Sequence, residues 1–195
     1  MMYRTVALAF LRHATAYTEA AAKDLLASVH LEITFDGTRM GMRLDGHDIT
    51  PLLRAPEISA MASRVATMKS VRQYLLPLQH GLATRYGLDS GLVAEGRDMG
   101  TVVFPEADLK FFLTASMDVR AQRRLFDLHK QGENVVYEEV LSAIIARDEQ
   151  DSKRSLAPLR QAADAILINT DLLSLDEQVD LVLNYIWERV RQTRR

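Results

Sequence analysis

The chain has 195 residues, of which 48% are apolar and 26% charged, and its formal net charge is −2. These values are ordinary for a folded domain and exclude a disordered, collagen-like or disulfide-stapled chain. The sequence contains no cysteine, which excludes a disulfide framework, a cysteine nucleophile and a thiolate metal site. No apolar run approaches the roughly 20 residues of a membrane-spanning helix. We therefore expect a cytoplasmic protein without membrane contacts.

The basic residues are unevenly divided, with 19 arginines and 5 lysines. Arginine grips phosphate with a planar fork, so this excess is weak support for phosphate recognition, and codon bias explains it equally well. A net charge of −2 offers no basic domain for nucleic acid, so no nucleic-acid partner is expected. The five histidines show no ligand spacing, which predicts that the protein itself binds no structural metal.

The first third of the chain changes from helical to strand periodicity. Apolar residues recur at helical spacing over 3–13 and again from Thr18 to Val29. The pattern then alternates over 31–35 and 40–44, with turn signals at Asp36-Gly37 and Asp45-Gly46. Two helices followed by a small antiparallel hairpin are predicted.

Helices and short apolar runs alternate in the remainder. Helices are predicted from Ala55 to Met68 and from Val71 to Leu78, the second ending before Gly81, and later over 118–131, 135–149 and 175–192, with a charged break at 147–154. The apolar runs 91–95, 109–115 and 165–169 are typical of buried parallel strands. We predict an α/β fold with a parallel sheet, flanking helices and a small antiparallel insertion.

Three arginine clusters follow the predicted strands or helices, where an α/β sheet places its ligand. Arg97-Asp98 follows the 91–95 strand, and a salt-bridged turn is the alternative interpretation. Arg147, Asp151 and Arg154 have the spacing of one helical face, which could equally be a solvated surface. The third cluster comprises Arg120, Arg123 and Arg124, which form either a cationic lid or an exposed helix face.

Several blocks of the sequence resemble the bacterial cytidylate kinase family. They lie at 91–105, 110–116, 120–124, 147–154 and 157–159 and read GLVAEGRDMGTVVFP, KFFLTAS, RAQRR, RDEQDSKR and APL. The resemblance runs from Met2 to about residue 190 and includes the hairpin insertion of this family. It implies transfer of the ATP γ-phosphoryl group to CMP or dCMP, with Mg²⁺ bridging the nucleotides, by a protein that we expect to be a monomer.

The resemblance also implies roles for single residues. Ser63, Arg72 and Asp98 would contact the cytosine edge, and Tyr3 the same pocket wall. The CMP phosphate would be held by Arg4, Arg97 and Arg154, and the sugar region by Arg147 and Asp151. Arg120, Arg123 and Arg124 would form a lid over about 117–133 that closes on the transferring group. Residues 1–29 and 88–195 would form the nucleotide-kinase core, and 30–87 the monophosphate-binding insertion.

One family element has no match in these 195 residues. The family's phosphate loop has the form Gly-x-x-x-x-Gly-Lys-Ser/Thr, whereas none of the nine glycines here is followed by lysine. We expect that the N-terminal strands and this loop are missing from the chain, which would leave inner strand edges and apolar surface exposed. A non-catalytic CMP-binding protein that has lost its ATP site is the alternative function.

Overall fold

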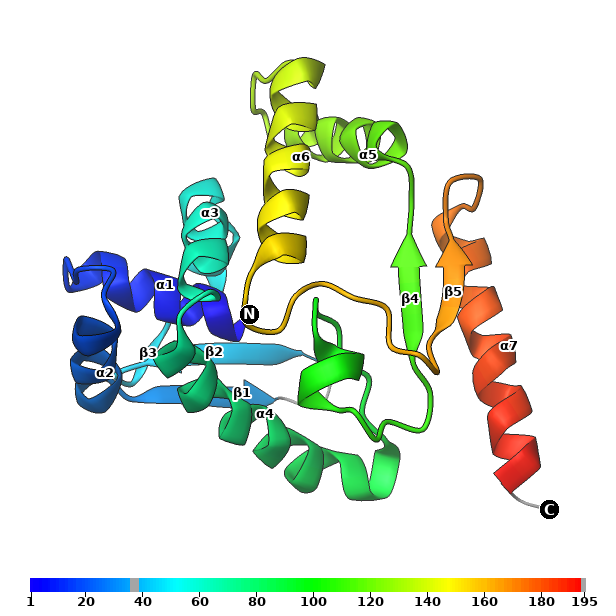
Figure 1. Cartoon of the computed structure of the whole chain (residues 1–195), viewed down its shortest axis with the longest axis horizontal. Coiled ribbons are helices and arrows are strands. Elements are labelled where there is room, and N and C mark those ends of the chain that lie inside the picture. Colours follow the sequence, from blue (N-terminus) through cyan, green and yellow to red (C-terminus); the bar gives the residue numbers. More distant parts are fainter. Residues whose placement is uncertain (36–38, 194–195) are drawn as a thin grey trace. The chain divides into compact units, whose positions relative to one another are not determined.

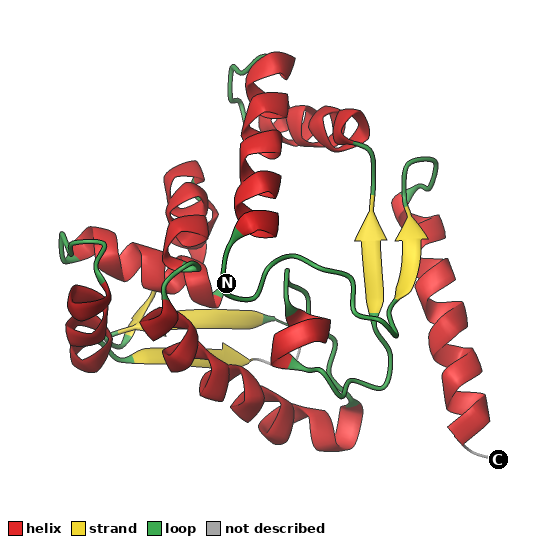
Figure 2. Ribbon diagram, viewed as in Figure 1, coloured by secondary structure: helices red, strands yellow, loops and turns green. Residues whose placement is uncertain are grey.

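The computed structural model describes residues 1–35 and 39–193 and divides the chain into two compact units (Figures 1 and 2). Unit 1 comprises Met1–Ala94 and Arg154–Leu156. Unit 2 comprises Glu95–Lys153 and Ala157–Arg195. Among the described residues, no helix has both the length and the apolar character needed to cross a membrane.

Unit 1 begins with the two predicted helices, α1 (Met2–Arg12) and α2 (Glu19–Ser28). Thr18 caps α2, because its Oγ1 accepts a hydrogen bond from the backbone N–H of Ala21 at 3.2 Å. After the hairpin, a 3₁₀ turn over Thr50–Arg54 leads into α3 (Pro56–Val65), and α4 (Lys69–Ser90) follows.

The predicted hairpin is present as a three-stranded antiparallel sheet in the order β1 (Leu31–Phe35), β2 (Met40–Leu44) and β3 (His47–Asp48). Asp45 and Gly46 both have positive φ angles, 50° and 78°, as a two-residue type I′ hairpin turn requires. The turn predicted at Asp36-Gly37 lies outside the described residues.

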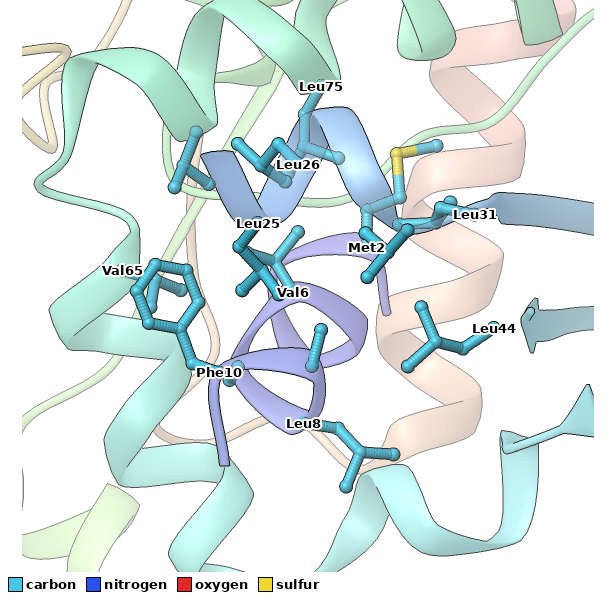
Figure 3. Packing of buried hydrophobic residues seen from close by; sticks show 14 of the residues in the cluster. Met2, Val6, Leu8, Phe10, Leu25, Leu26, Leu31, Leu44, Val65 and Leu75 are labelled. Atoms are coloured by element: carbon cyan, nitrogen blue, oxygen red, sulfur yellow. The ribbon is translucent and has the colours of Figure 1, made fainter. Parts of the chain in front are cut away.

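Helix α1 lies at the centre of the hydrophobic core of unit 1 (Figure 3). Val6 and Phe10 are almost completely buried, and they pack with residues of α2, the sheet, α3 and α4. Each such side chain contributes about 1.5–3 kcal/mol of transfer free energy. Residues 1–29 therefore pack with residues 30–78 in this unit. The division into a nucleotide-kinase core and a monophosphate-binding insertion stays a prediction. Tyr3 and Arg4 consequently lie on a helix that is packed into the core.

Unit 2 contains the parallel pair β4 (Phe111–Thr114) and β5 (Ile166–Asn169), with Phe111 opposite Ile166. This pairing confirms the predicted parallel arrangement of these two strands. The helices of this unit are α5 (Met117–Lys130), α6 (Tyr137–Lys153) and α7 (Leu175–Thr193), and α5 packs against α6 (Figure 1). A short π-helical turn covers Met99–Val103.

The strand predicted at 91–95 is wrong, because this segment has no regular structure and Val93 is 94% exposed. A strand needs a hydrogen-bonded neighbour, and within the described residues β4 and β5 pair only with each other. The predicted burial of the other two runs is found only in part, since Ile168 is buried whereas Leu113 and Leu167 are each 56% exposed. The expected exposure of apolar strand surface is thus confirmed.

Two predicted helix ends are also wrong. Helix α4 continues through Gly81 and Gly87 and ends only at Ser90, where Gly91, with a φ of 75°, caps it. Glycine in a helix interior costs about 1 kcal/mol, a penalty that tertiary packing overrides. Helix α6 continues to Lys153, so the charged segment at 147–153 is its last part and not a break. Spaced opposite charges are compatible with a helix.

Candidate functional site

Unit 1 contains five of the predicted nucleotide-binding residues, and the structure brings two of them together. The guanidinium carbon of Arg72, on α4, lies 5.6 Å from the ring centroid of Tyr3, on α1. Arg72 also donates from Nε to the carbonyl of Ala66 at 2.8 Å. Arg4 donates from Nη1 to the carbonyl of Leu53 at 2.7 Å, and Ser63 lies on α3, the helix that packs against α1. Tyr3 and Arg72 thus form a ring-and-guanidinium pair of cation–π type.

The start of α4, which carries Arg72, is held by a residue that sequence reasoning missed. The carboxylate of Glu19 accepts from the backbone N–H groups of Lys69 and Ser70, at 2.7 and 2.9 Å. Helix α4 has no side-chain cap of its own, because Met68 stands at its N-cap. Hydrogen bonding by Ser70, the largest effect, and by Lys69 holds the pKa of Glu19 below its ordinary value. The sequence signal was the missing cap at Met68.

In unit 2, a buried carboxylate connects two of the predicted arginines. Asp151, whose side chain is 7% exposed, accepts from Nε of Arg97 at 3.0 Å, and Nε of Arg147 lies 3.9 Å from the same oxygen. The predicted helical face is confirmed for Arg147 and Asp151, which are four residues apart on α6. Arg154 follows the last residue of α6, so it lies beyond that helix, and it belongs to unit 1. The arrangement exposes two guanidinium groups around one buried acid.

Asp98 follows Arg97 directly and is 4% exposed. Its carbonyl accepts from the backbone N–H groups of Val102 and Val103, at 2.9 and 3.1 Å, at the start of the π-helical turn. A buried carboxylate is costly unless it is hydrogen-bonded, so this position is typical of an acid with a defined partner. The ion pair of Arg97 reaches a residue 54 positions away, Asp151, and so connects distant segments rather than one turn.

All three predicted lid arginines lie on α5, in different surroundings. Arg120 donates from Nη2 to Oδ2 of Asp148 at 2.6 Å. Arg123 donates to Oγ1 and the carbonyl of Thr170, at 3.1 and 2.5 Å, and to the carbonyl of Leu173 at 3.3 Å. Arg124 is exposed. Arg120 and Arg123 are therefore hydrogen-bonded to other groups of the protein, a feature that the sequence did not indicate.

The carboxyl ends of β4 and β5 are joined by polar side chains that sequence reasoning also missed. Thr170 donates from Oγ1 to the carbonyl of Thr114 at 3.1 Å. Asp171 accepts from the backbone N–H of Ser116, the N-cap of α5, at 2.7 Å. That hydrogen bond is the largest cause that holds the pKa of Asp171 below its ordinary value. These bonds fix α5 to the edge of the sheet that α/β proteins use for ligands.

In the part of the chain that the structure describes, the carboxylates and imidazoles do not fit a resident metal ion. Across residues 1–35 and 39–193, no group of three or more His, Asp or Glu side chains is arranged to hold one. The carboxylates of Asp151 and Asp148 are instead engaged with arginines, and that of Glu19 with backbone N–H groups. No catalytic step is therefore assigned to a metal held by the protein.

Comparison with known proteins identifies the family. The model of the family described as cytidylate kinase matches residues 1–188. The cytidylate kinase of Geobacter sulfurreducens is 41% identical over 193 residues, which cover 98% of this chain and 81% of that protein. Those of Salinibacter ruber and Thermotoga maritima are 40% and 38% identical, over 95% and 96% of this chain and 82% and 83% of their own lengths. The chain therefore belongs to the cytidylate kinase family.

Proposed function

We propose that this protein transfers the γ-phosphoryl group of ATP to CMP or dCMP, giving CDP or dCDP. ATP enters as its magnesium complex, so the metal belongs to the substrate. A phosphate oxygen of CMP attacks the γ-phosphorus, the bond from that phosphorus to the β-phosphate oxygen breaks, and ADP leaves. Catalysis of this kind depends on positioning and charge neutralisation, which suits a site built from arginines.

The observation that carries this proposal is the Arg97–Asp151–Arg147 arrangement of unit 2. Asp151 accepts a hydrogen bond from Nε of Arg97, so both Nη groups of that arginine remain as donors for a phosphate. Hydrogen bonds between charged groups contribute about 1.5–3 kcal/mol each. We propose that Arg97 binds the CMP phosphate and that Arg147 and Asp151 face the sugar. Arg4 and Arg154 are proposed as further phosphate ligands.

Base selection is proposed for Asp98, Ser63 and Arg72, with Tyr3 as a wall of the same pocket. The exocyclic amine of cytosine donates to a carboxylate, whereas uracil would place a carbonyl oxygen there. An acceptor facing an acceptor leaves both unsatisfied, which is the strongest way for a polar site to reject an analogue. The burial of Asp98 supports this proposal, since burial excludes the water that would weaken the discrimination.

The proposed role of Arg120, Arg123 and Arg124 is to neutralise charge on the transferring phosphoryl group. Their position on α5, immediately after β4, supports this role because the carboxyl ends of parallel strands bear the ligand. The donor phosphates also require a cradle of backbone N–H groups, and no glycine of the 195 residues precedes a lysine. We therefore expect these 195 residues alone to turn over CMP far more slowly than a form with such a loop.

We also propose a cellular location, a class of partners and an oligomeric state. The absence of cysteine supports a reducing, cytoplasmic location, and the net charge of −2 supports small nucleotides rather than nucleic acid as partners. We propose that the protein acts as a monomer. Analytical ultracentrifugation with and without CMP tests this last point directly.

A coupled ADP-release assay tests the proposed reaction. CMP, dCMP and UMP are compared as acceptors, using the 195-residue chain and a form extended through the upstream in-frame codons of its gene. We expect turnover by the extended form with CMP or dCMP and little with UMP. No turnover with either cytidine nucleotide, in a folded extended form, would contradict the proposal. Equal turnover by the short chain would show that another group holds the donor phosphates.

A further inference from the structure

Asp148 is an acidic residue of α6 to which the proposed function assigns no role. Its Oδ2 accepts from Nη2 of Arg120 at 2.6 Å, slightly shorter than the about 2.7–2.9 Å usual for a hydrogen bond between charged groups. The Asp148 side chain is 22% exposed and that of Arg120 is 33% exposed. Because water reaches this pair only in part, the contact holds the guanidinium more firmly than a bridge on an open surface would.

The rest of the Arg120 guanidinium has no hydrogen-bond partner among the described residues, and the side chain is partly exposed. Its Nε is buried and has no hydrogen-bond partner among the described residues. A guanidinium has five N–H donors, and within the same residues Asp148 provides the one acceptor bonded to them. The orientation of the fork therefore depends on Asp148, while the Nη1 donors have no protein acceptor among the described residues and can bond to phosphate oxygens.

The two helices that carry this pair are fixed to each other by a second contact. Oη of Tyr137, the first residue of α6, donates to Oδ1 of Asp118 in the first turn of α5 at 2.8 Å. This hydrogen bond is the largest cause that raises the pKa of Tyr137. The first turn of α5 is thus bonded to α6 at two places. Asp118 binds Tyr137 at the beginning of α6, and Arg120 binds Asp148 near the end of α6. Asp148 reaches Arg120 from a rigid element and not from a loose loop.

Asp148 also adjoins the acidic centre of the proposed acceptor site. It follows Arg147 directly, and consecutive residues of an α-helix point about 100° apart. One side of α6 therefore carries Arg147 and Asp151, which holds Arg97, and the adjacent side carries Asp148, which holds Arg120. A single helix connects the arginines proposed for the acceptor nucleotide with one proposed for the transferring group.

We propose that Asp148 is a positioning residue that orients Arg120 toward the transferring phosphoryl group. This inference rests on the proposed function of Arg120. Nη2 stays bonded to Asp148 during the reaction, and the Nη1 donors of the same guanidinium bond to the phosphoryl oxygens. Fixing the fork in advance lowers the entropy lost when those bonds form, so its benefit appears in turnover more than in CMP binding.

The first test uses the ¹⁵N-labelled 195-residue chain and the Nε–Hε NMR signal of Arg120, assigned by its loss in Arg120→Lys. Asp148→Asn keeps the shape of the side chain and removes its charge. We expect the Arg120 proton to exchange with water at least about tenfold faster in this variant. Asp148→Glu should restore part of the protection. Glu149→Gln is the matched control, since Glu149 is 62% exposed and pairs with Lys153 on the same helix.

An unchanged Arg120 signal in folded Asp148→Asn overturns the inference. If that variant unfolds, Asp148→Glu decides the question, because its extra methylene must shift the Arg120 signal and an unshifted signal overturns the inference as well. In the extended form, Asp148→Asn should lower kcat at least about tenfold, equivalent to 1.36 kcal/mol, and leave the KM for CMP within about twofold. A loss of the same size in kcat/KM that came from a higher KM alone would contradict the positioning role of Asp148. Absence of turnover in every variant would contradict the proposed function, whereas the NMR result would still decide the role of Asp148.

Discussion

Asp151→Asn should separate Arg97 from the acid that orients it. The bond from Nε of Arg97 to Oδ2 of Asp151, at 3.0 Å, is worth about 1.5–3 kcal/mol, and the longer contact of Arg147, at 3.9 Å, about 0–1 kcal/mol. Breaking a fully buried pair costs about 3–5 kcal/mol. Arg97 and Arg147 are 44% and 49% exposed, so water solvates them once the acid is lost. We therefore expect a loss of about 2 kcal/mol in the free energy of unfolding.

Denaturant unfolding followed by the fluorescence of Trp187 measures this change. Trp187 is the single tryptophan of the chain and lies in unit 2, as do Arg97 and Asp151. A double-mutant cycle with Arg97→Gln should give a coupling energy of at least about 1 kcal/mol. CMP affinity should fall about tenfold in Asp151→Asn, because Arg97 is no longer held. Glu149→Gln should change stability by less than about 0.5 kcal/mol. Additive effects of the two substitutions would refute the proposed coupling.

Three further predictions concern other parts of the proposed site. Asp98→Asn should lose the preference for CMP over UMP in kcat/KM, and an equal decrease for both nucleotides would show that Asp98 does not contact the base. Arg154→Lys keeps the charge but loses the fork, so kcat/KM for CMP should fall about tenfold, whereas unchanged kinetics would place Arg154 outside the site. Glu19→Gln should lower the free energy of unfolding by about 1 kcal/mol at neutral pH. Because the folded-state pKa of Glu19 is lowered, its stabilisation is present above the unfolded pKa and is lost as pH falls through the folded value, so wild type and Glu19→Gln should converge in acid. A constant difference in stability from pH 7 to pH 3 would contradict the assignment.

The first two helices and the hairpin of unit 1 could be predicted because their signals are local. The helical spacing of Val6 and Phe10, the cap at Thr18 and the Asp45-Gly46 turn each lie within a few residues of the structure that they specify. The sequence blocks at 147–154 and 120–124 likewise identified residues that the structure places on α6, Arg154 excepted, and on α5. Periodicity and motifs were sufficient for these features.

The segment at 91–95 shows where such reasoning fails. An apolar run has the same pattern whether or not another strand lies beside it, and the described residues provide none for this one. The ends of α4 and α6 were misplaced because glycine and charge are weak helix breakers when packing favours the helix. Local patterns also do not predict hydrogen bonds between residues that are far apart in the sequence. Glu19 meets Lys69, and Arg123 meets Thr170, across about 50 positions of sequence.

Isothermal titration of the 195-residue chain with CMP and with UMP tests the central claim most directly. The chain contains every residue proposed to bind the acceptor nucleotide, so this measurement does not depend on the donor phosphates. We predict saturable binding of CMP at one site and binding of UMP that is weaker by about tenfold or more. Equal affinities for CMP and UMP, or no binding of CMP by the folded chain, would contradict the account.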